Sequence, residues 1–372
     1  PASEGRVLAG LYFANSIGAA IGALAATYFL LPKVGLPGAI MTAGLLNIAV
    51  AVAVYPLSKQ EGAGASRPAS APMPGSHPAA ATPVLVLAVA ALTGATSFVY
   101  EITWVRMLSL ALGTTIHAFE VMLAAFISGI AFGGLWLRHR ADRMQSPLAV
   151  AGWVQVLMGL AALASMFVYS QAFEWVGWLL RVIARTGEGY ALYNLSSGLI
   201  SLLVMFPAAF FAGMTLPLLT LALLRQGGGE RVIGRVYATN TLGAIVGVLV
   251  AVHLLLPLLG LKLALWLAAA VDLVLGVVVL HAMAPGQSGR RLSPPAWAAI
   301  MSVIGLGLSL LLVKFDPLML ASSVYRHGGS FLDNTRMLYY RDGKTASIAV
   351  YERGEGKDLL RAISTNGKVD AA

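Results

Sequence analysis

The chain has 372 residues, of which 58% are hydrophobic and only 11% are charged, and its formal net charge is +9. Because soluble domains carry roughly 25% charged residues, this composition excludes an ordinary soluble protein and indicates an integral membrane protein surrounded by lipid. The absence of cysteine excludes thiol catalysis, disulfides and cysteine-ligated metals. The positive charge lies mostly in short loops, which is typical of residues that set the orientation of a membrane protein rather than of a nucleic-acid-binding surface.

Apolar windows of about 20 residues predict membrane-spanning helices rather than the alternating ten-residue strands of a barrel. The expected fold class is therefore an all-α polytopic membrane protein. The predicted spans are Val7–Leu31, Leu36–Leu57, Val84–Gly113, Ile116–Leu137, Leu148–Tyr169, Ala191–Met214, Val232–Leu256, Leu261–Ala282 and Ala296–Val313.

The segments between these spans differ in composition. Residues 58–82 are rich in Pro, Ala, Gly and Ser and predict a flexible linker between a first membrane segment, residues 1–57, and a second, residues 83–283. Phe173–Arg185 carries two tryptophans among charged residues and predicts an amphipathic helix lying at the membrane interface. Residues 284–314 are expected to add one further transmembrane helix.

Charge asymmetry sets the expected orientation. If the spans alternate in direction, the basic loops fall together on one side, which we expect to be the cytoplasmic side of a bacterial inner (plasma) membrane. Their cations are Arg138, Arg140, Arg143, Arg225, Arg231, Arg235, Arg290 and Arg291, with Lys59 and Arg67 of the linker. After an odd number of spans, residues 315–372 are then expected on the outer, periplasmic side.

This C-terminal tail alternates polar and apolar residues as short β-strands do. Met337–Tyr340 and Ser347–Tyr351 flank the turn signal Asp342–Gly343, and Ile363–Val369 contains a second turn signal, Asn366–Gly367. We expect a short β-hairpin element without a core of its own.

One stretch of the sequence occurs twice. Arg6–Leu36 aligns without a gap on Arg231–Leu261, at a constant offset of 225 residues (240 − 15 for the paired Asn). The identities are Arg6/Arg231, Val7/Val232, Tyr12/Tyr237, Asn15/Asn240, Gly18/Gly243, Ala19/Ala244, Gly22/Gly247, Pro32/Pro257, Gly35/Gly260 and Leu36/Leu261. Apolar composition does not explain matched Arg, Tyr, Asn, Pro and Gly. We therefore expect a duplicated membrane unit, complete in residues 83–283 and represented by its last two helices in residues 1–57, so that the chain begins within its first repeat.

Each copy carries an Asn followed by a Gly-x-x-x-Gly pattern. The residues are Asn15, Gly18 and Gly22 in the first copy and Asn240, Gly243 and Gly247 in the second. Small residues let helix backbones approach closely, and an Asn can form a hydrogen bond across the contact. The pattern predicts helix packing in both copies.

Four polar side chains form a candidate substrate or proton site near the outer ends of the third and fourth spans. They are Glu101, Arg106, His117 and Glu120, and the turn at Gly113–Thr115 is expected to bring them to one membrane face. The alternative is an interfacial ion-pair cluster that only fixes the hairpin, because the ends of spans tolerate charge.

Asp272 lies deep in the eighth span, where the repeat places Asn47 in the first copy. A carboxylate at this depth is costly and suggests substrate or proton coupling, with a structural hydrogen bond as the alternative. Tyr100 and Trp104 are expected to belong to an aromatic belt at the membrane surface.

Several short motifs follow one another in the order typical of one family. They are Thr93–Gly94, Tyr100–Arg106, Gly113–Thr115, Gly129–Gly133, Ala141–Arg143, Tyr237–Ala244, Leu338–Ala346 and Thr365–Ala371. In these motifs, which extend over nearly the whole chain, the sequence resembles the bacterial fused major-facilitator/spermidine-synthase-like membrane proteins. The resemblance implies major-facilitator-like six-helix repeats, the second complete and the first partial, and a tail similar to the start of a spermidine-synthase-like β-domain.

The resemblance also limits the expected chemistry. The Gly-rich loop that binds decarboxylated S-adenosylmethionine in that family does not follow Asp370, and Thr345 and Asp370 stand where the family carries Gln. We expect no catalytic residues, no metal and no cofactor within this chain. Decarboxylated S-adenosylmethionine would be a cofactor only if a complete synthase domain followed.

Three functions stay open at this point. The first is a membrane protein that handles a small solute, an amine being one option. The second is a non-catalytic structural or anchoring subunit that binds other membrane subunits. The third is a membrane-bound aminopropyltransferase whose catalytic domain lies beyond this chain.

Overall fold

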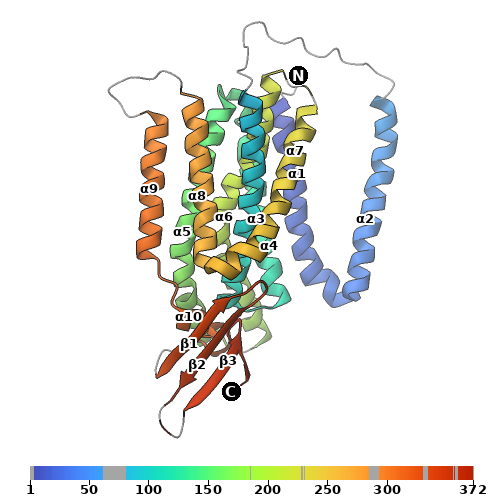
Figure 1. Ribbon diagram of the computed structural model, residues 1–372. Helices are drawn as coiled ribbons and strands as arrows, with labels where there is room; N and C mark the ends of the chain where they lie inside the picture. The colour runs from blue at the N-terminus through green and yellow to red at the C-terminus, as the bar shows by residue number, and fades with distance from the viewer. Residues whose placement is uncertain are drawn as a thin grey trace.

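The computed structural model describes residues 4–61, 81–184, 186–227, 229, 231–284, 293–329, 334–354, 356 and 359–371. Most of the predicted linker and the basic pair Arg290 and Arg291 lie outside these residues. The helices run roughly side by side, and a small sheet covers one end of them (Figure 1). The helices are α1 (Glu4–Ala25), α2 (Leu31–Glu61), α3 (Ala81–Leu112), α4 (Ile116–Arg138), α5 (Pro147–Val182), α6 (Gly187–Arg225), α7 (Arg231–Val250), α8 (Leu256–Ala282), α9 (Pro294–Leu312), α10 (Pro317–Leu320) and α11 (Val324–His327).

Seven helical segments of the described chain are long and apolar enough to cross a membrane, which confirms a multi-pass, mostly α-helical membrane protein. Two of them, Gly5–Pro56 and Arg231–Ala282, each hold two of the predicted spans. Their chain reverses at Gly35 (φ 65°, ψ −177°) and Gly260 (φ 75°, ψ 177°), backbone angles that glycine adopts without a Cβ clash (Figure 1).

The two aligned segments share a second local feature. A five-residue π-helical turn precedes each reversal, η1 (Ala26–Leu30) in the first and η3 (Ala251–Leu255) in the second. These turns and the reversing glycines stand at the same 225-residue offset as the sequence identities. The grouping of the helices into major-facilitator repeats stays a prediction.

The core of the bundle surrounds α3, which packs against α7 and α8, while α4 packs against α1 and α6. Tyr100 and Trp104 are buried in this core, 1% and 0% exposed, so their prediction as a surface aromatic belt was wrong. Both side chains bury their polar ends against partners, and the Trp104 Nε1–H donates to Ser165 Oγ at 2.9 Å. Because these hydrogen bonds satisfy the hydroxyl and the indole N–H, the two rings can be buried without leaving an unpaired polar group.

The prediction of a separate interfacial helix at Phe173–Arg185 was also wrong. Helix α5 continues without a break to Val182, because no proline follows Tyr169 and Gly177 lies within the helix, against Gly328 of the tail. Its last turns contact the C-terminal tail, where the Arg181 guanidinium donates to the Gly328 carbonyl at 3.2 Å. The extra length therefore supports the tail rather than lying along the lipid surface.

The tail forms a four-stranded antiparallel sheet in the order of the sequence, which is larger than the predicted hairpin element. Its strands are β1 (Thr335–Asp342), β2 (Ser347–Arg353), β3 (Leu360–Thr365) and β4 (Lys368–Ala371). Asn366 (φ 49°) and Gly367 (φ 78°) form the predicted turn between β3 and β4. The sheet lies at the end of the bundle that holds the α3–α4 and α7–α8 turns, whereas the α4–α5 and α6–α7 connections lie at the other end (Figure 1).

Helix α2 stands apart from the rest of the bundle (Figure 1). Its residues from Ala43 to Pro56 are all exposed, including large apolar side chains such as Leu45 and Ile48. An apolar helix in this position is stable only when lipid or another helix covers it.

Candidate functional site

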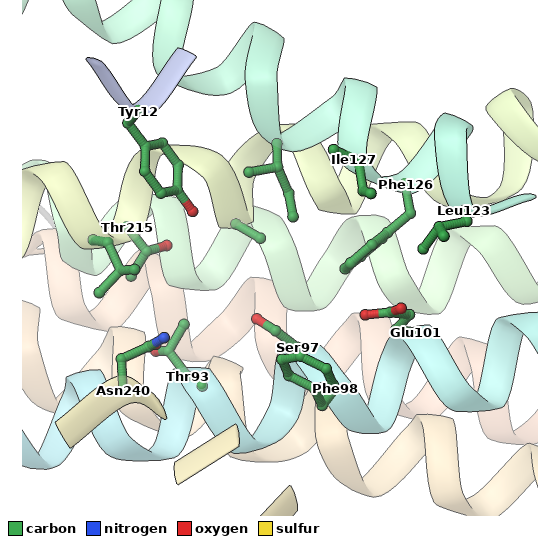
Figure 2. Close-up of a pocket in the computed structure, with 14 residues that line it drawn as sticks. Tyr12, Thr93, Ser97, Phe98, Glu101, Leu123, Phe126, Ile127, Thr215 and Asn240 are labelled. Atoms are coloured by element: carbon green, nitrogen blue, oxygen red, sulfur yellow. The ribbon is translucent and has the colours of Figure 1, made fainter. Parts of the chain in front are cut away.

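A cavity of about 330 Å³ lies between α1, α3, α4, α6 and α7. Most of its wall is apolar, as in many small-molecule sites, with a few polar groups facing inward. The polar lining residues, shown in Figure 2, are Tyr12, Thr93, Ser97, Glu101, Thr215 and Asn240. Segments far apart in the sequence thus meet around one cavity.

Helix α3 supplies the main polar stripe of this cavity. Thr93, Ser97 and Glu101 are spaced four residues apart, so they lie on one face of the helix. Figure 2 shows Ser97 and Glu101 opposite Phe126 of α4. Glu101 is the only acidic residue among those that line the cavity, and it has no ion-pair partner within the described part of the chain.

A neighbouring stripe of α3 holds a second polar contact. Asp272 of α8 is fully buried; Thr96 Oγ1 donates to its Oδ1 at 2.8 Å, and the Tyr100 hydroxyl donates to its Oδ2 at 2.6 Å. Asp272 does not line the cavity that contains Glu101. Its hydroxyl partners tie α8 to α3.

The four polar residues predicted to share one membrane face are distributed over three places. Glu101 lines the cavity, and Arg106 reaches the sheet, where its guanidinium donates to the carbonyls of Gly343 at 3.3 Å and Lys344 at 3.1 Å. His117 stacks on Tyr28 of η1 with ring centroids 5.4 Å apart, and Glu120 is partly exposed on the same helix. None of the four forms an ion pair with another within the described residues.

The two Gly-x-x-x-Gly patterns have different surroundings. In α7, a Cβ on Gly243 would lie 1.9 Å from the Ala91 carbonyl oxygen, and one on Gly247 would lie 2.3 Å from that of Ala95. In α1, a Cβ on Gly18 or Gly22 would meet no atom within 4 Å. Only the second copy packs its glycines against a helix of the described chain.

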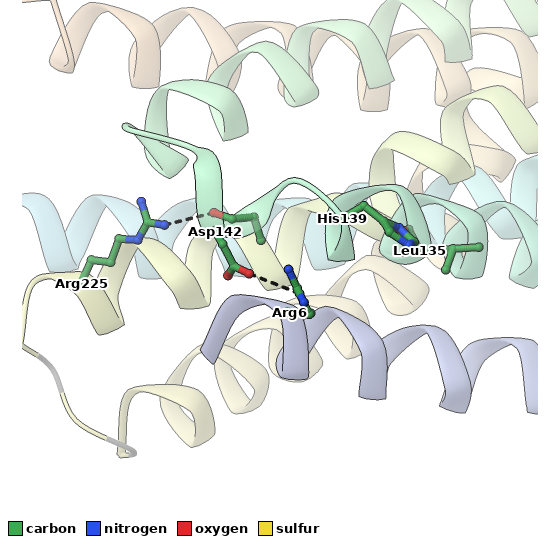
Figure 3. Close-up of polar contacts among 6 residues, drawn as sticks. Arg6, Leu135, His139, Asp142 and Arg225 are labelled. Carbon is green, nitrogen blue, oxygen red and sulfur yellow. Dashed lines mark hydrogen bonds and ion pairs between the residues drawn. The ribbon is translucent and has the colours of Figure 1, made fainter. Parts of the chain in front are cut away.

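The loop between α4 and α5 lies at the end of the bundle opposite the sheet (Figure 1). It contacts both α1 and α6 (Figure 3). Arg6 of α1 forms an ion pair with Asp142 at 3.4 Å, and Arg225 of α6 donates to the Ala141 carbonyl at 3.0 Å and to that of Met144. The arginines therefore hold α1 and α6 to this loop.

A carboxylate also holds the sheet to the bundle. Asp342 Oδ2 accepts a hydrogen bond from the Leu261 backbone N–H, and Arg341 donates to the Pro257 carbonyl at 3.2 Å. Burial and the Asp342 carboxylate raise the pKa of the neighbouring Tyr340 above its ordinary value, so this phenol stays protonated and donates to Asp342 Oδ1 at 2.9 Å.

Sequence reasoning missed Tyr12 as a cavity residue, and Thr96, Tyr100 and Asp342 as members of polar contacts. The spacing of Thr96 and Tyr100 at i and i+4 was the available signal, because it places two hydroxyls on one helical face. The contacts of Asp342 carry no such signal, because they depend on where the sheet packs.

Within the described residues, no group of three or more His, Asp or Glu side chains is arranged to hold a metal ion. Comparisons of this chain with protein-family models, with curated proteins and with solved structures found no match.

Proposed function

We propose that this chain belongs to a membrane transport protein of the fused major-facilitator/spermidine-synthase-like family and that its cavity binds a small cationic solute. The supporting observation is Glu101, the one acidic residue on the lining of a mostly apolar cavity. A carboxylate inside a membrane bundle is costly unless a counter-charge or a proton accompanies it. A bound cation would supply that counter-charge.

The neighbouring polar groups favour an ammonium ion. A primary ammonium has three N–H donors and needs three acceptors. Glu101 and Ser97 offer oxygen atoms along one face of α3, and Asn240 offers a side-chain oxygen from α7, whereas the Thr93 hydroxyl already accepts from Gln155. Phe98 and Phe126 line the same cavity and would contact an alkyl chain.

The volume of about 330 Å³ limits the solute to a small molecule, near the lower end of ordinary ligand sites. A short alkyl diamine satisfies both the size and the charge. Transport further requires that the cavity open alternately to the two sides of the membrane. Helices α1 and α4 would move during this opening, because both line the cavity.

The test is binding and uptake of 1,4-diaminobutane by the purified chain reconstituted in vesicles. Glu101→Gln should weaken binding by at least about tenfold, since it removes the only acidic group of the lining. Glu120→Gln is the matched control, because Glu120 is on a neighbouring helix but not on the cavity wall. Equal binding by the wild type and by Glu101→Gln would overturn the proposal.

A second role, as an anchor for the sheet and any domain attached to it, is supported by a different observation. Arg106 of α3 and the Leu261 N–H of α8 both bind the β1–β2 region. If anchoring is the whole function, diamine uptake should be absent while the sheet stays attached.

A further inference from the structure

The contact between α3 and α7 is a backbone-to-backbone contact made by three residues of α7. Gly243 and Gly247 face the Ala91 and Ala95 carbonyls, and a Cβ on Gly94 would lie 2.2 Å from the Asn240 carbonyl oxygen. A side chain larger than hydrogen at any of these glycines would separate the helices. Asn240, Gly243 and Gly247 are therefore the residues that let α3 dock on α7.

Helix α1 carries the same three residues at the same spacing, but no residue of the described chain packs on its two glycines. Asn15, Gly18 and Gly22 are exposed, and open space surrounds the Cβ positions of both glycines. The other face of α1 is packed, since Ala9 and Ala20 are buried and α4 lies against it. The open face is thus a distinct surface on a helix that is otherwise fixed in the bundle.

Helix α2 lacks the corresponding neighbour as well. Its Asn47 stands at the position of Asp272 in α8, which receives hydrogen bonds from Thr96 and Tyr100 of α3. Asn47 is exposed in the middle of an apolar helix, where a side-chain amide without a partner is costly in lipid. In the second copy, α3 provides the partners for both the glycine face and this polar position.

We propose that Asn15, Gly18 and Gly22 of α1, together with Asn47 of α2, form a docking face for one transmembrane helix from outside these 372 residues. That helix would carry small residues spaced as Ala91, Gly94 and Ala95 are in α3, followed by hydroxyl side chains at the positions of Thr96 and Tyr100. A second copy of this chain fits this face less well, because its own α7 already covers these small residues of its α3.

The probe is a synthetic peptide with the sequence of residues 81–112, in which Ala91 is replaced by Cys. The purified chain has no native cysteine, so a single cysteine can be placed on each face of α1. Under mild oxidation in vesicles, the Gly18→Cys chain should form a disulfide with the peptide. The Ser16→Cys chain should not, because Ser16 is 7% exposed on the packed side. Adding Gly22→Leu should reduce the Gly18→Cys cross-link several-fold, since the larger side chain fills the groove.

The other outcomes each overturn the proposal. Equal cross-linking at Gly18→Cys and Ser16→Cys, or with a peptide of scrambled sequence, would indicate random collision in a face that only lipid covers. Disulfides between two Gly18→Cys chains in preference to the peptide would indicate a homodimer. Preferential cross-linking of the peptide to a Gly243→Cys chain would indicate that the peptide displaces the chain's own α3 from α7 rather than binding α1.

Discussion

The carboxylate of Asp342 in β1 accepts a hydrogen bond from the backbone N–H of Leu261 at 3.1 Å, directly after the glycine at which the α7–α8 segment reverses. Reversal at Gly260 leaves the amides of the following helical turn without intrahelical acceptors, and a carboxylate is the usual kind of group that satisfies them. The other oxygen of Asp342 accepts from Tyr340 and from Ser347, the latter at 2.6 Å. One side chain thus binds the sheet and the membrane bundle together.

Replacing Asp342 by Ala should loosen the sheet from the bundle, because three donors lose their acceptor at once. The expected cost is about 1–3 kcal/mol of docking free energy. Faster proteolysis and amide hydrogen exchange in β1 and β2 would report it. Asp370→Ala is the matched control, since Asp370 is exposed in β4. Identical exchange in both variants would contradict the role of Asp342.

The two glycine patterns should respond differently to a single methyl group. Gly243→Ala should destabilise the purified chain by about 1–3 kcal/mol, because its Cβ would overlap the Ala91 carbonyl. Gly18→Ala should be neutral or slightly stabilising, since its Cβ meets open space and Ala favours a helix over Gly. Thermal unfolding in detergent measures both, and equal losses would show that the α1 face is packed.

The role of Asp272 can be separated from that of its partners by a double-mutant comparison. Asp272→Ala should cost about 1–3 kcal/mol, because the hydroxyls of Thr96 and Tyr100 would be left without an acceptor. In a Thr96→Val/Tyr100→Phe background, the same substitution should be neutral or stabilising, since it then removes an unpaired buried carboxyl group. A loss of equal size in both backgrounds would show that the hydroxyls are not its main partners.

The sidedness of the sheet can be measured with a membrane-impermeant thiol reagent, since the chain has no cysteine of its own. Lys368 is exposed in β4, and Arg140 is exposed at the opposite end of the bundle. If the basic loops are cytoplasmic, Lys368→Cys should be labelled in cells with a permeable outer membrane, while Arg140→Cys should be protected until the inner membrane is opened. The reverse pattern would place the sheet in the cytoplasm.

The predictability of this fold differs from element to element. Long apolar runs fix the membrane helices, and the Asn366–Gly367 pair predicts the β3–β4 turn, because each depends on local chemistry alone. The side to which Tyr100 and Trp104 point was predicted wrongly, because it depends on which helices surround α3. The polar cluster around Glu101 was expected because the Gly113–Thr115 turn joins the ends of two spans, whereas the side chains leave α3 in different directions, Arg106 toward the sheet and Glu101 into the cavity.

The π-helical turn η3 determines where the sheet can attach. A π-helical turn contains one residue more than an α-helical turn, so everything after it is rotated by about 100° around the helix axis relative to an uninterrupted helix. The glycines before η3 face α3, while Pro257 and Leu261 after it face Arg341 and Asp342. Deleting one residue of Ala251–Leu255 would therefore keep the glycine face of α7 and the sheet contacts at Pro257 and Leu261 chemically intact. Their relative direction would change, however, so that α7 could not pack on α3 while the sheet stayed bound to the bundle.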